Sequence, residues 1–402
     1  RRARLRRKGR PVKKSLIALA MGAFVLGFAE FVMMGILPVV AQGVDVSVAW
    51  AGNFITAYAV GVCAGATMLV VGRRVPPRTL IIGFMAICAV GNAVSALSGD
   101  PAMLLAGRFI AGLPHGAFFG TATLASKMLA DPGREGQAVA TMVLGQTVAN
   151  MVGVPAGTLL ATAFSWHAPF VFATAWAVLA AVLIWRFVPA LDAIPDAGLA
   201  GQFAFLKAPG PWLILAAVLL GNTGIFCWWS YVSPWLQHMG GFAEAAVPML
   251  LVLAGAGMVV GSTLGGRAAD LKSPGVAAAA GQSLAGVALL LVFLFGRGSV
   301  LCAALMFVVS VGLFFVSSPQ QILMVEVGQG GGELLGGACV QIAFNGGNAI
   351  GAQVGQMVLN TGAAYNWIGL AGVPFSVVAV ALLLLFARRY ERRYHLAATG
   401  RA

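Results

Sequence analysis

Charge is what this sequence most lacks. Only 9% of its 402 residues are Asp, Glu, Lys or Arg, whereas soluble globular domains carry about 25%. At the same time, 60% of the residues are hydrophobic and the mean hydropathy is +0.91. So little polar side-chain surface excludes an ordinary soluble domain, and it predicts an all-α membrane protein built from long apolar helices.

Cysteine and histidine are also scarce. The five cysteines all fall within apolar runs, are odd in number and form no C-x-x-C pair, so neither a disulfide framework nor a metal site is indicated. None of the four histidines belongs to an H-E-x-x-H motif, and no Ser/His/Asp set stands out. The sequence therefore gives no sign of enzyme chemistry, and we expect no cofactor and no metal ion.

Basic residues are concentrated at the start of the chain. Nine of the 25 Lys and Arg residues lie in residues 1–14, ahead of the first apolar run. We interpret this segment as a cytoplasmic tail facing anionic lipid, because the rest of the chain offers too little polar surface for nucleic acid. A secretory signal peptide also begins with basic residues, but its apolar core is about 7–15 residues long. The run over 15–41 is nearly twice that length, so a retained helix is predicted.

Twelve apolar runs of about 20 residues or more follow one another along the chain. Lys and Arg are concentrated in alternate connecting loops, which places both termini in the cytoplasm by the positive-inside rule. The longest connection divides the runs into two sets of six. The predicted segments are a basic tail (1–14), an N-terminal six-helix bundle (15–188), a cytoplasmic linker (189–209), a C-terminal six-helix bundle (210–387) and a C-terminal tail (388–402). The predicted spans are 15–41, 50–71, 78–98, 101–124, 136–161, 166–188, 210–237, 245–265, 274–295, 299–325, 334–360 and 365–387.

Two charged residues, Glu30 and Arg108, fall well inside predicted spans. An ionisable group at that depth costs roughly 2.5–3.5 kcal/mol on insertion scales, so such residues usually face an internal cavity and carry a proton, an ion or a substrate. At 1.5 Å per residue, Glu30 lies about 16 Å and Arg108 about 10 Å from the outer ends of their helices. We therefore expect the two to pair. Burial favours the protonated form of the Glu30 carboxyl, and a nearby guanidinium favours its ionised form. A conformational change that alters either effect can therefore load a proton onto Glu30 or release it. The alternative is a static ion pair between two helices.

The fourth span carries small residues in register with its arginine, in the segment RFIAGLPHGAFFG. Gly112 and Gly116 follow Arg108 at four-residue spacing and form one helical stripe, along which another helix can approach closely. His115 stands beside this stripe. It either relays protons, contacts a substrate or hydrogen-bonds to a helix backbone.

Polar and aromatic residues are spread over the fifth, seventh and eleventh spans. In the fifth span, Gly153, Pro155 and Gly157 permit a bend and close packing at a joint between the two halves. The amides and aromatic rings suit a neutral hydroxylated or amphiphilic ligand, and the alternative is hydrogen bonding between helices. The candidate substrate-binding residues are His115, Asn150, Asn222, Trp229, Gln341 and Asn345, and Asn348 shares a helix face with the last two.

These motifs resemble those of the major facilitator superfamily, in its twelve-helix drug:proton antiporter branch, and the chain is similar to AraJ-type sugar efflux permeases. The resemblance covers about residues 13–390 and rests on GAFVLGFAEFVMMGILPVVA, GRFIAGLPHGAFFG, TVANMVGVPAGT and GGELLGGACVQIAFNGGNAIGA. It implies two six-helix bundles that rock around a central cavity in a bacterial inner membrane. It also implies export of a sugar-like or amphiphilic compound in exchange for protons, with Glu30 as the acid of the first span and Arg108 as the arginine of the fourth.

The sequence departs from the family pattern in three places. The loop after the second span reads GRRVPPR, with Arg73 but without the usual acid, whereas its counterpart GGRAADLK keeps Arg267 and Asp270. The N-terminal half therefore lacks one charge of the family's inner gate. The fifth span has Gly-Val-Pro in place of Gly-Pro, and His167 stands where the family has an arginine. The residues assigned to conformational motifs are Gly112, Gly116, Gly153, Pro155, Gly157, Arg73, Arg267 and Asp270.

Three functions compete at this stage. A proton-coupled exporter is favoured, an uncoupled facilitator or a proton symporter of a sugar or nucleoside is the alternative, and a membrane-embedded enzyme has the least support. Glu30 distinguishes them, because a passive pore needs no buried acid. The expected partners are a small-molecule substrate and the lipid bilayer, with protons as the coupling ion, no nucleic acid, and the monomer as the functional unit.

Overall fold

A computed structural model describes residues 9–68, 72, 75–131, 134–191, 204–271, 273–328 and 333–392. In these ranges the chain forms helices and no strand, which confirms the all-α prediction. Three predicted features lie wholly or partly outside the described residues: Arg73, most of the linker, and most of the two tails.

The N-terminal half forms six membrane-crossing segments, two of which are interrupted. Ser47 and Asp100 cap the helices that follow them by accepting hydrogen bonds from backbone N–H groups. The elements are α1 (Gly9–Gly43), α2 (Val48–Gly65), α4 (Pro77–Ala96), α5 (Pro101–Gly112), α6 (Pro114–Leu129), α7 (Glu135–Val148), the π-helix η2 (Ala149–Gly153), α8 (Val154–Ala163) and α9 (Ala168–Phe187).

The C-terminal half repeats this plan with six further segments. The elements are the 3₁₀ turn η3 (Ala204–Lys207), α11 (Pro209–Trp229), α12 (Val232–His238), the 3₁₀ turn η4 (Glu244–Ala246), α13 (Val247–Leu271), α14 (Pro274–Phe295), α15 (Ser299–Val327), α16 (Glu333–Asn360), α17 (Trp367–Phe386) and the π-helix η5 (Ala387–Glu391). Eleven of the described segments are long and apolar enough to span a membrane. The twelfth segment, α16, is more polar, but at 28 residues it is as long as the others.

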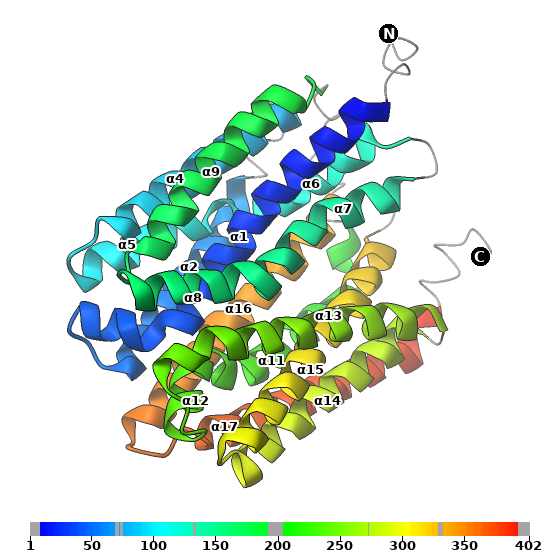
Figure 1. Cartoon of the computed structure of the whole chain (residues 1–402). Helices are drawn as coiled ribbons and strands as arrows, with labels where there is room; N and C mark the ends of the chain where they lie inside the picture. The colour runs from blue at the N-terminus through cyan, green and yellow to red at the C-terminus, as the bar shows by residue number, and fades with distance from the viewer. Residues whose placement is uncertain are drawn as a thin grey trace.

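The helices of the two halves form two groups that lie side by side (Figure 1). The polar helix α16 packs against both α2 and α11, so it lies where the groups meet. The start of α1 and the end of η5 lie at the same end of the molecule, and the helix axes of the two groups diverge towards that end (Figure 1). We call the opposite end, which carries the loops 44–47, 97–100 and 296–298, the outer end.

Three interruptions follow from proline. Proline has no N–H group and its ring crowds the carbonyl four residues earlier, so helical hydrogen bonding fails just before it. Pro114 follows the break between α5 and α6, and Pro234 follows the break between α11 and α12. Pro155 is the second residue of α8, which begins directly after the π-helix η2. Short π-helices of this kind are frequent at functional sites, and η2 contains the candidate residue Asn150.

Candidate functional site

Glu30 lies inside the protein, on the central helix α1. Only 2% of its surface is exposed, and α1 is enclosed by α2, α7, α8 and α9. The neighbouring side chains on α1 are almost all apolar and buried. A carboxylate in such surroundings is stable only if polar groups face it or if it holds a proton. Its partners therefore decide what this site can do.

His115 of α6 lies within ion-pair distance of the Glu30 carboxylate. Its Nε2 atom lies 3.6 Å from Glu30 Oε2, and its side chain is completely buried. The other ring nitrogen, Nδ1, lies 2.8 Å from the hydroxyl of Tyr58 on α2. That hydroxyl also donates to the backbone carbonyl of Leu26, at 3.2 Å. Tyr58, His115 and Glu30 thus lie end to end as buried polar groups, and among the described residues His115 Nε2 makes no hydrogen bond at this separation.

Arg108 lies next to these groups but does not pair with Glu30 as the sequence predicted. Its Nη1 donates to the carbonyl of Ala29 at 2.7 Å, and its Nε donates to the carbonyl of Phe54 at 3.4 Å. Its guanidinium lies 4.4 Å from the centre of the Tyr58 ring, a cation–π arrangement. Among the described residues, the ion-pair partner of Glu30 within 4 Å is His115. The expected direct pair is therefore absent because backbone carbonyls and an aromatic ring hold the arginine.

The C-terminal half also reaches Glu30. The side chain of Asn348, on α16, lies close to the carboxylate. Asn348 is itself buried. Glu30 therefore has one polar neighbour, His115, in its own half and another, Asn348, in the other half, so movement between the halves changes its surroundings.

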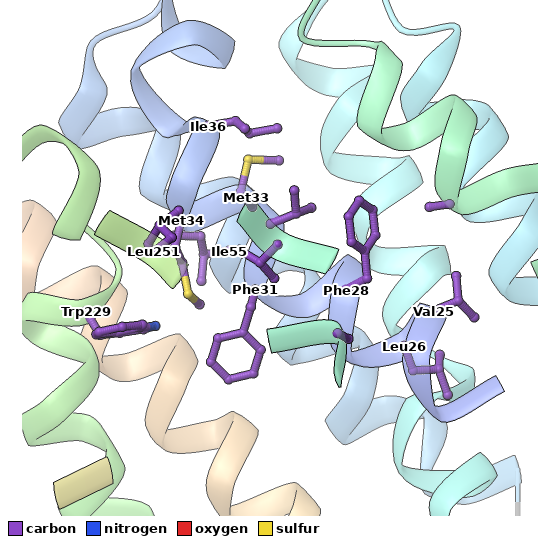
Figure 2. Close-up of a cluster of buried hydrophobic side chains, with 14 of the residues drawn as sticks. Val25, Leu26, Phe28, Phe31, Met33, Met34, Ile36, Ile55, Trp229 and Leu251 are labelled. Atoms are coloured by element: carbon purple, nitrogen blue, oxygen red, sulfur yellow. The ribbon is translucent and has the colours of Figure 1, made fainter. Parts of the chain in front are cut away.

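A small cavity of about 10 Å³ lies between the two halves on the outer side of Glu30, about the space of one water molecule. Asn150 and Trp229 line it from opposite halves. Both amide atoms of Asn150 and the indole nitrogen of Trp229 are buried without a hydrogen-bond partner in the described part of the chain. Figure 2 shows Met34 of α1 beside Leu251 of α13 at this contact, with Trp229 on the same side. Unpaired polar atoms at an apolar contact between halves are suited to bind a polar group of a solute.

The other predicted substrate residues are partly satisfied by their own helices. Asn222 donates to the carbonyl of Val218, and Asn345 donates to that of Gln341, each four residues earlier. Both amide oxygens remain buried without a hydrogen-bond partner among the described residues. Gln341 is partly exposed on α16. These amides lie on α11 and α16, away from the small cavity.

The predicted glycine motifs lie at close helix contacts. A side-chain Cβ at Gly112 would lie 2.2 Å from the backbone oxygen of Tyr58 on α2, so only glycine allows α2 and α5 to approach this closely. Gly153 and Gly157 pack directly against phenylalanines of α1. Gly116 has more room, since its nearest neighbour would be 3.6 Å away. The conformational residue Arg267 lies exposed on α13, and the side chain of Asp270 lies outside the described atoms.

A group of residues that the sequence did not single out joins α2 to α16 near the outer end. Gln353 donates to Asn53 at 2.8 Å and to Thr56 at 3.0 Å. The hydroxyl of Tyr231, at the break between α11 and α12, lies 3.2 Å from the carbonyl of Ala49 and 2.9 Å from that of Ala352, and its single hydrogen donates to one of them at a time. We call Asn53, Thr56, Tyr231 and Gln353 the outer seam. In the sequence these residues are recognisable as polar positions inside predicted spans, but nothing in their spacing indicates which of them contact one another.

Residues 19–336 match the family model of the Major Facilitator Superfamily. The chain belongs to this family. It is 41% identical to the AraJ protein of Escherichia coli strain K12 over 385 residues, which cover 95% of this chain and 97% of AraJ. It is 31% identical to a chloramphenicol resistance protein of Streptomyces lividans, over 93% of this chain and 96% of that one. A Helicobacter acinonychis protein named "Probable sugar efflux transporter" is 25% identical over 92% and 93% of the two chains.

Solved structures agree with this assignment at the level of the fold. The model matches the crystal structure of a bacterial homologue of the human lysosomal transporter Spinster, solved in an inward-facing, unoccupied conformation, with a TM-score of 0.71. The match covers 98% of each chain at 15% identity. This Major Facilitator Superfamily transporter is thus a multi-pass membrane protein with the fold that its sequence predicted. Its family and fold are those of transporters.

Proposed function

We propose that this transporter exports a small sugar-like or amphiphilic solute in exchange for protons, by alternating access. The observation that carries the proposal is the position of Glu30, which is buried deep in α1 and has polar side chains close to it from both halves of the protein. Ionisable residues inside a membrane are costly and are kept where they serve a function. A facilitator that moves its solute downhill has no use for one.

The coupling follows from the two-sided contact. When the halves separate around Glu30, the carboxylate exchanges the Asn348 amide for water and its proton affinity changes. Solute binding and proton binding then favour different arrangements of the halves, and each ligand shifts the equilibrium only through that difference. Arg108 remains charged throughout, and its contacts with the carbonyls beside Glu30 keep the positive charge near the carboxylate.

The solute class is proposed from the contact between the halves. Asn150 and Trp229 offer a donor, an acceptor and an aromatic face there, and no described charged residue lines the small cavity. Such a lining suits hydroxyl groups on a neutral ring or chain. The names of two relatives, for chloramphenicol resistance and for sugar efflux, are compatible with this class.

The remaining expectations concern the setting of the protein. We propose that it works as a monomer in a bacterial inner membrane, with both termini in the cytoplasm and with no bound cofactor. The outer seam then faces away from the cytoplasm. The hydrogen bonds across it favour the interpretation that this conformation is closed to the outside.

A transport assay tests the coupling. Thermal stability of the purified protein is first screened against sugars, nucleosides and drugs, because a ligand at a hundred times its Kd adds about 2.7 kcal/mol. The solute that stabilises most is then loaded into proteoliposomes under an imposed pH difference. Solute movement against its own gradient and opposite to the direction of proton flow supports antiport. Movement that only equalises the solute, at any pH difference, supports the uncoupled facilitator, and uphill movement in the direction of proton flow supports the symporter.

A further inference from the structure

Packing alone does not explain why His115 and Tyr58 are buried near Glu30. Both are polar, and both are almost completely shielded from solvent. Apolar residues of similar size would fill the same space without the cost of burying polar atoms. Their placement end to end with the carboxylate therefore requires a separate explanation.

The hydrogen-bond inventory of Tyr58 restricts the state of His115. The phenol carries one hydrogen, and the Leu26 carbonyl can only accept. If the phenol donates to Leu26, then the 2.8 Å contact with His115 requires a proton on Nδ1, which donates to the phenol oxygen. The neutral ring then presents a lone pair at Nε2, and this atom faces Glu30 Oε2. A lone pair and an ionised carboxylate repel each other, so one proton between them is required for attraction.

We propose that His115 shares the transported proton with Glu30, and that Tyr58 is the positioning residue that holds His115 with Nδ1 protonated and Nε2 directed at the carboxylate. The proposal rests on the proposed function, since it specifies where the coupled proton is held. In one form the proton is on Glu30, which donates to Nε2. In the other the proton has moved to Nε2, giving an imidazolium beside a carboxylate, and no charge is gained or lost in the exchange. Release to water leaves an ionised Glu30 and a neutral His115.

The geometry needs only a small adjustment for this exchange. The present separation of 3.6 Å exceeds the usual 2.9–3.0 Å hydrogen bond by about 0.6–0.7 Å. The ring of His115 is held by Phe119 at 5.2 Å between centroids and by Tyr58 edge-on, so closure depends on α1 and α6 rather than on a free ring rotation. Two other charged or titratable groups lie around the His115–Glu30 pair. One is the guanidinium of Arg108 on α5, which lies over the ring of Tyr58, and the other is the thiol of Cys88 on α4.

Nitrogen-15 solid-state NMR of the full-length protein in proteoliposomes tests the proposal without any solute. The histidine signal that disappears in His115→Gln belongs to His115. We expect it to show a protonated Nδ1 at every pH, with Nε2 alone responding to pH. A His115 with bare Nδ1 and a permanently protonated Nε2 would overturn the proposal, because Tyr58 would then be the donor and His115 could not accept the proton at Nε2.

Tyr58→Phe tests the positioning role, since it keeps the ring beneath Arg108 and removes only the hydroxyl. We expect the protonated Nδ1 signal to lose its dominance and proton-driven transport to fall about three- to tenfold, the effect of one net hydrogen bond. Tyr365→Phe is the matched control, because Tyr365 also lies against a histidine ring, that of His238, but in a loop at the outer end. Unchanged His115 signals in Tyr58→Phe would contradict the proposal. If these tests fail while Glu30→Gln still abolishes uphill transport, antiport stands and the sharing by His115 does not.

Discussion

Replacing Gln353 by methionine is the sharpest test of the outer seam as a gate. Methionine has nearly the same length and shape, but it removes the two hydrogen bonds that Gln353 makes to Asn53 and Thr56 across the halves. In the opposite arrangement of the halves these groups would face water, so only the net value of each bond is lost, about 0.5–1.5 kcal/mol. The total of about 1–3 kcal/mol corresponds to a shift of roughly 5–150-fold in the ratio of the two conformations.

Spin labels at Gly99→Cys and Arg297→Cys, on outer loops of the two halves, report this shift in a cysteine-free background. Both positions are exposed, and a side chain at Gly99 meets nothing within 4 Å. Pulsed EPR should find a larger population of long distances in Gln353→Met. The control is Gln237→Met, which removes a hydrogen bond to Ser233 within one half. Identical distance distributions in the two variants would refute the idea that Gln353 helps close the outer end.

Three further predictions concern the interior and the last segment of the protein. Gly112→Ala places a methyl group 2.2 Å from a backbone oxygen of α2. The resulting overpacking should reduce the stability of the protein by about 1–3 kcal/mol, which a lower melting temperature would show. Gly116→Ala is the control: its methyl group has 3.6 Å of room, so this variant should melt close to the wild type. Arg108→Lys should reduce uphill transport at least about tenfold with little loss of folded protein, because lysine cannot donate to two carbonyls in the fixed geometry of a guanidinium; wild-type pumping would contradict this role. The carboxylate of Glu391 accepts hydrogen bonds from the N-terminal turn of α14. We expect Glu391→Ala to lower the free energy of unfolding of the protein by about 1–3 kcal/mol. An equal loss in the exposed control Glu244→Ala would show that these hydrogen bonds are not responsible.

Most of the fold was predictable because its signal is local. A helix that crosses a bilayer needs about 20 apolar residues, and each such run can be read independently of the others. Even α16, which is too polar to be recognised by hydropathy alone, has the right length and position in the series. The fourth span was predicted as one continuous helix, so the break before Pro114 was missed, whereas a bend near Pro155 was expected; both interruptions follow from the missing N–H of proline.

The site was predicted only in part, because its contacts depend on how helices face one another. The importance of Glu30 follows from its depth, and His115 was recognised as a candidate for relaying protons. Tyr58 was missed because an aromatic residue in a membrane span is unremarkable until its hydroxyl is seen against a histidine. The expected pairing of Glu30 with Arg108 was wrong because charge alone cannot reveal that backbone carbonyls occupy the guanidinium.

The outer seam shows the same limit. Asn53 and Gln353 are 300 residues apart in sequence, and amides inside spans are common enough that their pairing has no signature. Only the packing of α2 against α16 brings them together.

The most direct test of the account is solute transport by Glu30→Gln in proteoliposomes with an imposed pH difference, measured beside the wild type with the solute identified by the stability screen. Glutamine keeps the shape of a protonated carboxyl and can still donate and accept hydrogen bonds, but it cannot bind and release a proton. The account predicts that this variant still exchanges solute down its gradient and no longer moves it uphill. Uphill transport by Glu30→Gln at the wild-type rate would contradict it.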